Sequence, residues 1–195
     1  MLFPEVPVAM LQSSLKSGLS CMVADLLDAL DAYTREHSFG VALLGERLAR
    51  KMELPEEERS RIFWAGLVHD VGKIFVPREI LCKPAGLTPE EFQTVQSHTS
   101  LGYQLLKERE ELSSLAHLAL HHHERWDGRG YPGKLQGEEI PLGARILGVA
   151  DSWDAMTSSR PYRKALPQKR AMRELRRGEG MQFDPQVVEA FWELS

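Results

Sequence analysis

The sequence predicts an all-α protein that folds as a single compact domain of roughly eight or nine helices. Apolar residues recur every three or four positions along most of the chain, which is the spacing of one face of an α-helix. The sequence contains no convincing pair of strands and no internal repeat. The chain has 195 residues, of which 43% are hydrophobic, so it is long enough for one well-packed core. We expect this domain over residues 19–195, after an N-terminal arm or linker at residues 1–18.

Two helical segments are expected first along the chain. Apolar residues follow a helical period across residues 19–52, where Gly40 is a candidate position for a break or kink. A second helix is expected to start at Pro55, because proline suits the first helical position and the glutamates that follow suit the positive end of the helix dipole. This helix should run to residues 69–70, and Gly72 can end it.

The rest of the chain repeats the same helical signals. Residues 88–91 form a capping box with proline at the first helical position, and the predicted helix continues through His98. The segment 112–124 is a further helix that ends in a run of three histidines. The glycines and the proline of residues 127–133 exclude a regular helix there. Closing helices are expected from Pro141 to the Arg160-Pro161 pair, from Pro167 to Arg177, and from Asp184 to Leu194.

Composition excludes several classes of function. The net charge of −4 and the pI of about 6.0 argue against a general binder of nucleic-acid polymers, which usually carries a broad basic excess. Cys21 and Cys82 are too few for a disulfide framework and indicate a reducing compartment. No stretch reaches the roughly 18 apolar residues that a membrane span needs, and the N-terminus lacks a basic signal region. We therefore expect a cytoplasmic protein without a membrane partner.

Histidine and aspartate side chains give the strongest functional signal. Buried residues of these two types usually need a partner, and a divalent metal ion is one that suits both. Seven candidate ligands are too many for one metal and natural for two, and Asp70 is the best placed to bridge them. The donor set suits Fe, Mn, Ni, Co or Zn. The candidates are His37, His69, Asp70, His98, two of His121 to His123, and Asp151.

Several motifs in one order resemble the HD-GYP family of bacterial cyclic di-GMP phosphodiesterases, within the HD metal-phosphohydrolase superfamily. The resemblance covers roughly residues 24–194 and includes an intact Gly130-Tyr131-Pro132 signature. It implies an HD-type helical domain. The motifs are Tyr33-Thr34-x-x-His37-Ser38, His69-Asp70-x-Gly72-Lys73, His98-x-x-x-Gly102, His122-His123-Glu124-x-x-Asp127-Gly128-x-Gly130-Tyr131-Pro132 and Asp151-x-x-Asp154-Ala155-Met156-Thr157-x-x-Arg160-Pro161-Tyr162-Arg163.

The resemblance assigns a ligand set for two divalent metal ions, with Fe or Mn as the first expectation and Ni, Co or Zn as alternatives. Asp70 matches the carboxylate that bridges the two metals. The residues that match the core site are His37, His69, Asp70 and Asp151, and those that complete the second site are His98, His122 and His123.

The resemblance also implies a set of substrate contacts. Lys73 matches a lysine that faces the substrate phosphate, so Lys73 and Asp70 are the expected catalytic residues. Arg160 and Arg163 match basic residues that contact the dinucleotide, and the fork of a guanidinium suits phosphate oxygens. The full set of implied substrate contacts is Lys73, Gly130, Tyr131, Pro132, Arg160 and Arg163.

The leading hypothesis from the sequence is hydrolysis of cyclic di-GMP through a bridging hydroxide held by the two metals. Family members that hold three metals have a glutamate where this chain has Tyr33, a poor ligand. We therefore expect two metals and linear pGpG as the main product, with GMP as a further product in question. Two alternatives stay open, namely an HD phosphohydrolase acting on another nucleotide and a low-turnover module that binds cyclic di-GMP or a protein. The Gly130-Tyr131-Pro132 loop could dock diguanylate cyclase (GGDEF) proteins, and the N-terminal helix could form a homodimer.

Residues next to the candidate ligands are expected to support them. Asp154 is predicted to orient a histidine N–H. Glu124 and Asp127 either do the same or anchor the loop. His117 and His121 are spaced like a metal pair but are interpreted as surface or packing residues.

Overall fold

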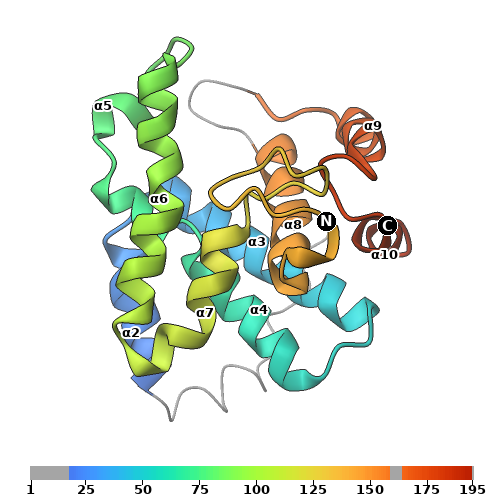
Figure 1. Ribbon diagram of the computed structural model, residues 1–195, viewed down its shortest axis with the longest axis horizontal. Coiled ribbons are helices and arrows are strands. Elements are labelled where there is room, and N and C mark those ends of the chain that lie inside the picture. Colours follow the sequence, from blue (N-terminus) through green and yellow to red (C-terminus); the bar gives the residue numbers. More distant parts are fainter. Residues whose placement is uncertain (1–17, 159–163, 195) are drawn as a thin grey trace.

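A computed structural model describes residues 18–158 and 164–194, and within these ranges it confirms the all-α class (Figure 1). The β-type contact found there is an isolated bridge between Glu179 and Phe183. Two 3₁₀ helices, η1 (Val71–Phe75) and η2 (Gly137–Glu139), join longer elements. The nine α-helices of the described ranges are α2 (Gly18–Asp28), α3 (Ala32–Lys51), α4 (Glu56–Val68), α5 (Arg78–Leu81), α6 (Pro89–Lys107), α7 (Glu110–His121), α8 (Leu142–Thr157), α9 (Gln168–Gly178) and α10 (Pro185–Trp192).

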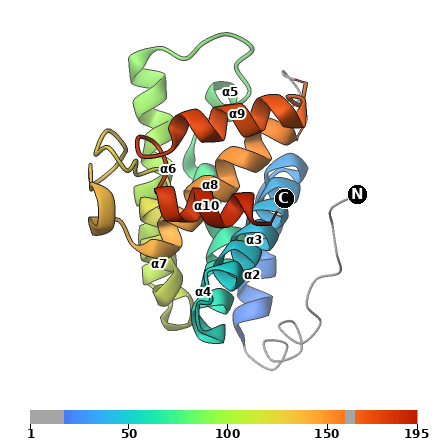
Figure 2. The same ribbon diagram turned by 90° about the vertical axis from the view of Figure 1, so that its right-hand side faces the viewer.

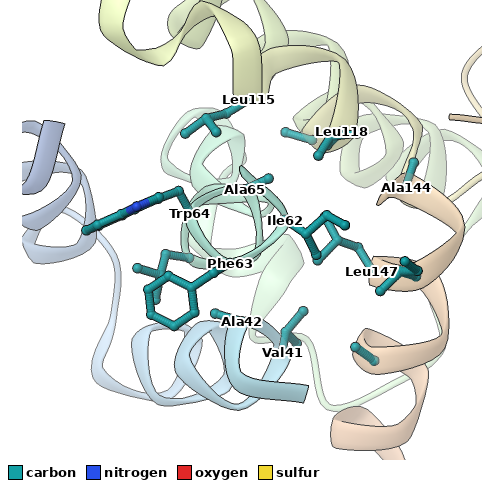
Figure 3. Close-up of a cluster of buried hydrophobic side chains, with 14 of the residues drawn as sticks. Val41, Ala42, Ile62, Phe63, Trp64, Ala65, Leu115, Leu118, Ala144 and Leu147 are labelled. Carbon is teal, nitrogen blue, oxygen red and sulfur yellow. The ribbon is translucent and has the colours of Figure 1, made fainter. Parts of the chain in front are cut away.

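Helix α4 lies at the centre of the hydrophobic core (Figure 3). All seven residues of its segment 62–68 are buried, and a helix that is apolar on every side needs neighbours on every side. Helix α3 covers one side, α7 another and α8 a third. The core side chains around α4 include Val41, Ala42, Leu115, Leu118, Ala144 and Leu147. The buried end of α4 thus holds the next residues, His69 and Asp70, in the middle of the molecule.

A pair of glycines lets η1 approach α6. A Cβ atom added at Gly72 would collide with the backbone carbonyl of His98, and the nearest atom to a Cβ added at Gly102 is the Gly72 nitrogen, at 3.3 Å. This close approach requires glycine at position 72. It brings the start of η1 to the turn of α6 that carries His98.

The C-terminal helices α9 and α10 both pack on α8, on the face turned to the viewer in Figure 2. Asp184 accepts a hydrogen bond from the Gln186 backbone at 2.8 Å and so caps α10, as its sequence position predicts. The predicted capping box at Thr88 is also confirmed, because Thr88 and Glu91 bond each other's backbone N–H. Within the described residues, no helix is both long and apolar enough to cross a membrane.

Two sequence-based predictions about helix boundaries are wrong. Helix α3 is unbroken at Gly40, and the break falls before Asp31, whose side chain caps α3 at the Thr34 N–H. Gly40 instead makes room for Asp154, because an added Cβ would collide with that carboxylate. Helix α4 ends at Val68 rather than at Gly72, where glycine serves the contact with α6. The predicted arm lies outside the described residues except at its last residue, with which α2 begins.

Candidate metal centre

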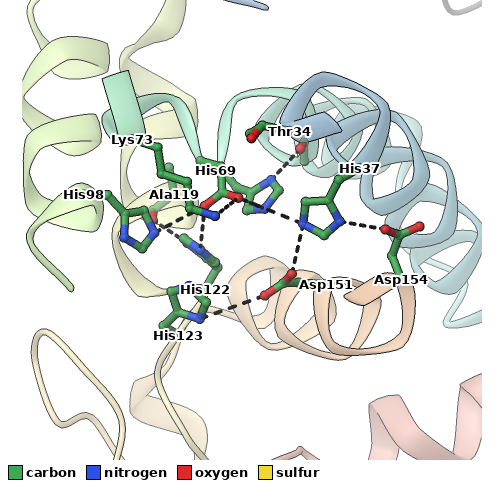
Figure 4. Close-up of polar contacts among 12 residues, drawn as sticks. Thr34, His37, His69, Lys73, His98, Ala119, His122, His123, Asp151 and Asp154 are labelled. Carbon is green, nitrogen blue, oxygen red and sulfur yellow. Dashed lines mark hydrogen bonds and ion pairs between the residues drawn. The ribbon is translucent and has the colours of Figure 1, made fainter. Parts of the chain in front are cut away.

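Five helices bring the predicted ligands to one place (Figure 4). Each histidine except His123 is at most 5% exposed, and Asp70 is 1% exposed. Burying so many ionisable groups together is costly unless they share a partner. The ligands come from α3 (His37), from the residues after α4 (His69 and Asp70), from α6 (His98), from the residues after α7 (His122 and His123) and from α8 (Asp151).

Asp70 lies between two groups of imidazole rings. Its Oδ1 atom is 3.3 Å from Nε2 of His98 and 4.0 Å from Nε2 of His122. Its Oδ2 atom is 3.3 Å from Nε2 of His69 and 3.9 Å from Nε2 of His37. Each carboxylate oxygen therefore faces its own group of histidines, which is the arrangement that a bridging carboxylate needs.

Three of the histidines are oriented by their own helices. In each, the Nδ1–H donates to the backbone carbonyl three residues earlier, which leaves Nε2 as the atom that faces Asp70. The distances are 2.7 Å from His69 to Gly66, 2.6 Å from His98 to Val95 and 2.7 Å from His122 to Ala119. The positions of these nitrogens are thus fixed before any ligand binds.

Divalent metals fit the atoms that remain without partners. Nε2 of His69, His98 and His122 and Oδ1 of Asp70 are buried without a hydrogen-bond partner among the residues that the structure describes. Such orphaned polar atoms are rare in folded proteins and call for an explanation. Two groups in the described residues have donor atoms within 4.8 Å of one another, and Asp70 belongs to both. They are His37, His69 and Asp70, and Asp70, His98, His122 and His123.

His37 is held by carboxylates at both ring nitrogens. Its Nδ1 is 2.6 Å from Asp154, and its Nε2 is 3.1 Å from Asp151. Burial alone lowers the pKa of His37, but the hydrogen bonds to Asp151 and Asp154 outweigh it and raise the pKa to about 9. The predicted role of Asp154 in orienting a histidine is thus matched by its contact with His37. Asp151 lies outside the two groups of donor atoms but reaches the cluster through His37.

His123 and Lys73 lie on the exposed side of the cluster. The His123 Nδ1 is 3.9 Å from Asp151, and burial lowers the pKa of His123 to about 4. The Lys73 ammonium is 2.5 Å from Asp70 Oδ2. Burial raises the pKa of Asp70, yet the charge of Lys73 and the neighbouring His69 hold this pKa well below its usual range. Asp70 is therefore ionised, the form in which a carboxylate can hold a metal ion.

The glycine-rich loop of residues 126–136 is held against the centre by Glu124. The buried carboxylate of Glu124 accepts hydrogen bonds from the backbone N–H of Gly133 at 2.6 Å and of Leu135 at 3.1 Å. The Tyr131 N–H donates to the His123 carbonyl at 3.2 Å, and the two rings lie 4.9 Å apart. Glu124 therefore anchors the loop, and its carboxylate also lies 3.3 Å from Nδ1 of His121, so its contacts match both of the roles considered for it.

Asp127 and Gly130 also shape this loop. Asp127 accepts two hydrogen bonds from the Arg125 guanidinium, at 3.0 and 2.7 Å, and one from the Arg129 N–H at 3.1 Å. A Cβ added at Gly130 would collide with the backbone of Arg125 and Glu124. Position 130 therefore requires glycine, and the loop folds back over the end of α7.

A cleft of about 250 Å³ opens beside the cluster. His122, His123 and Asp151 form its inner end, and Gly130 and Tyr131 form part of its wall. Other lining residues were not predicted: Trp126 stands at an unassigned position of the motif that begins at His122, and Arg145 and Gln182 come from separate segments without a motif. Of the other predicted substrate contacts, Pro132 is exposed and not among the lining residues, and Arg160 and Arg163 lie outside the described residues. His117 and His121 lie outside the cluster, stacked 6.2 Å apart on α7.

Comparisons with known proteins point to one family. The profile of a family described as HD domain matches residues 18–187. A protein of Thermotoga maritima named cyclic di-GMP phosphodiesterase is 43% identical over 178 residues, which are 88% of this chain and 48% of that protein. A 3′3′-cGAMP-specific phosphodiesterase of Vibrio cholerae is 38% identical over 88% of this chain and 34% of its own length. The chain thus spans between a third and a half of these relatives.

The fold is also found among solved structures. A protein of Bdellovibrio bacteriovorus, titled an HDG"Y"P protein, superposes with a TM-score of 0.68. The match covers 83% of this chain and 52% of that one at 18% identity. At this low identity the match concerns the fold alone.

Proposed function

The chain belongs to the HD domain family, and from this premise we propose that it is a metal-dependent phosphodiesterase that hydrolyses cyclic di-GMP to linear pGpG. The resemblance to the HD-GYP family is confirmed by relatives that are named cyclic di-GMP phosphodiesterases. Because the chain spans only part of their length, the activity itself is a proposal. Analysis of the products measures whether pGpG is cleaved further to GMP.

The position of Asp70 between two groups of imidazole nitrogens is the observation that carries this proposal. It supports a centre for two divalent metals that share one carboxylate. Fe or Mn is our first expectation, with Ni, Co or Zn as alternatives. The residues that would hold the metals are His37, His69, Asp70 and Asp151 on one side, and Asp70, His98, His122 and His123 on the other.

The chain's own residues would bind and orient the substrate. Bound divalent ions would neutralise charge on the phosphate and make water a better nucleophile near neutral pH. The Lys73 ammonium, which is held at Asp70, would offset phosphate charge at the open side of the cluster. Water adds to phosphorus and the bond to the ribose 3′ oxygen breaks, which leaves a 5′-phosphate and a 3′-hydroxyl. Arg160 and Arg163 stay predicted contacts of the dinucleotide.

One comparison favours a second candidate substrate. The Vibrio relative is named for 3′3′-cGAMP, a cyclic dinucleotide in which an adenine replaces one guanine. The same metal centre would cleave either compound, because both present the same phosphodiester. The two substrates must therefore be compared directly.

The test combines metal content with hydrolysis on one anaerobically purified sample supplied with Fe(II) or Mn(II). We expect about two metals per chain and pGpG as the product of cyclic di-GMP, with 3′3′-cGAMP and cyclic di-AMP in the same panel. Asp70→Asn should lose both metals and His98→Gln only one. His117→Gln, a histidine exposed on α7, is the matched control and should keep both metals and the activity.

Each remaining outcome changes the proposal in a defined way. Two metals without hydrolysis of any substrate would favour a low-turnover module that binds cyclic di-GMP or a protein. One metal or none in the unaltered chain would contradict the ligand set.

The partner predictions belong to the same proposal. The 126–136 loop, with Tyr131 at the cleft, is the surface proposed to dock diguanylate cyclase (GGDEF) proteins. A pull-down that survives Tyr131→Ala would count against this interface. A homodimer and a cytoplasmic location stay predictions, which sedimentation and cell fractionation test.

A further inference from the structure

A second cavity, of about 430 Å³, lies between α8 and α9 and adjoins the cleft. We name it the α8/α9 cavity. Ser152 lines both spaces and directly follows the proposed metal ligand Asp151 in α8. Arg125, Gln182 and Phe183 also line both. A ligand whose phosphate lies at the metal centre could therefore extend across Ser152 into this cavity.

The walls of the α8/α9 cavity suit a flat aromatic ring. Met156 from α8 and Met181 and Phe183 from the turn before α10 supply apolar surface. Thioether and phenyl groups pack well against aromatic faces. The volume lies within the roughly 300–1,000 Å³ that is common for small-molecule sites. A purine base fits these walls in size and character.

The polar edge of the cavity favours guanine over adenine. Glu174 and Arg177 line it from α9 and form an ion pair at 3.4 Å. The guanine edge offers N1–H and the exocyclic amine to a carboxylate, and O6 and N7 to a guanidinium. Adenine carries an amine in place of O6, so this hydrogen-bond donor would face the N–H donors of the Arg177 guanidinium.

A ligand can replace the ion pair between Glu174 and Arg177 with little loss of free energy. The two side chains are 39% and 76% exposed, and exposed ion pairs contribute little to stability. Lys169, Arg170 and Arg173 are exposed on the same helix and create a positive potential near the cavity. This potential favours the approach of a dinucleotide with two phosphates.

We propose that the α8/α9 cavity binds one guanine base of the substrate, with Glu174 and Arg177 reading its edge between Met156, Met181 and Phe183. This inference rests on the proposed function, since it places a base of cyclic di-GMP beside the metal centre. It adds residues from α9 that determine which base is accepted.

The first arm of the test does not depend on turnover. Methionine methyl groups are labelled with ¹³C in the protein loaded with diamagnetic Zn(II), which is titrated with GMP and, separately, with AMP. Met156→Leu and Met181→Leu assign the two signals. We expect GMP to shift both signals at concentrations about tenfold below those of AMP. Signals that do not move with GMP, or that move equally with AMP, would overturn the inference.

The second arm identifies the residue that selects guanine. Glu174→Gln should abolish the preference for GMP and raise the KM for cyclic di-GMP about tenfold. Glu179→Gln is the matched control, because Glu179 forms the next i,i+3 pair along, with Arg176, and does not line the cavity. Bis(p-nitrophenyl) phosphate has no base, so its hydrolysis should be the same in both variants.

The two arms separate failure of the inference from failure of the proposed function. An unaltered protein that does not cleave cyclic di-GMP contradicts the proposed function, while the methyl shifts still decide whether the cavity binds guanine. Efficient cleavage with an unchanged KM in Glu174→Gln contradicts the cavity alone.

Discussion

The candidate metal centre and the open side formed by the 126–136 loop and the α8/α9 cavity are built in opposite ways. Around Asp70, the histidine rings other than that of His123 are buried, and three of them are fixed by carbonyls of their own helices. On the other side, the 126–136 loop is held by the carboxylate of Glu124 and by backbone hydrogen bonds to neighbouring segments, and the Glu174–Arg177 pair is exposed to solvent. Metal chemistry needs donor atoms placed to within a fraction of an ångström, whereas a base can be read by groups that adjust. The difference predicts that changes on the buried side act on metal content and stability, and changes on the open side act on substrate binding.

The largest effect is expected where two buried elements meet. Gly72→Ala would place a methyl group against the His98 carbonyl, and backbone atoms cannot move aside as a flexible side chain can. We expect the free energy of unfolding to fall by about 3 kcal/mol, at the upper end of overpacking costs. Urea titration followed by circular dichroism measures this change.

Gly86→Ala is the matched control, because an added Cβ there meets no described residue within 4 Å. Its free energy of unfolding should change by less than roughly 0.5 kcal/mol. Equal urea midpoints of unfolding for the two variants would contradict a tight contact between η1 and α6. The contrast between a rigid and an adjustable side of the molecule would then not hold.

A smaller effect is expected at the outer end of His37. Asp154→Ala removes the carboxylate 2.6 Å from Nδ1, so His37 loses the group that sets its orientation and tautomer. Loss of such a partner usually lowers metal affinity or activity by about 10- to 100-fold. Metal titration of the metal-free protein measures the affinity directly.

A conservative replacement distinguishes positioning from general damage. Asp154→Asn keeps an oxygen that can accept the Nδ1 hydrogen bond, so it should recover part of the affinity that Asp154→Ala loses. Asp28→Ala removes an exposed aspartate paired with Arg35 at 2.9 Å and should leave metal affinity unchanged. Equal losses in Asp154→Asn and Asp154→Ala would contradict an orienting role for Asp154.

The sequence predicted the buried side better than the open side, for a physical reason. Helical period and capping are local signals, and they placed His98 and Asp70 on or beside the right helices. The roles of Gly40 and Gly72 could not be predicted, because each depends on a residue from another helix. The α8/α9 cavity left no sequence signal, since its walls come from four separate segments.

The smallest effect is expected from loosening the 126–136 loop. Glu124→Gln keeps one acceptor oxygen, but its amide NH₂ would face either the Gly133 or the Leu135 N–H, which now donate to the carboxylate. The loop should then be less well ordered beside His123, and the KM for cyclic di-GMP should rise by roughly five- to tenfold, the loss of one charge-assisted hydrogen bond. Steady-state kinetics with cyclic di-GMP and with bis(p-nitrophenyl) phosphate separates substrate binding from the chemical step.

Glu138→Gln is the control for this change, because Glu138 is exposed in the adjoining η2. It should leave the KM for both substrates unchanged. If Glu124→Gln instead lowers metal content while the KM for cyclic di-GMP stays constant, then Glu124 supports His123 rather than the loop. Glu124 would then belong to the rigid side of the molecule, because it would hold a proposed metal ligand in place.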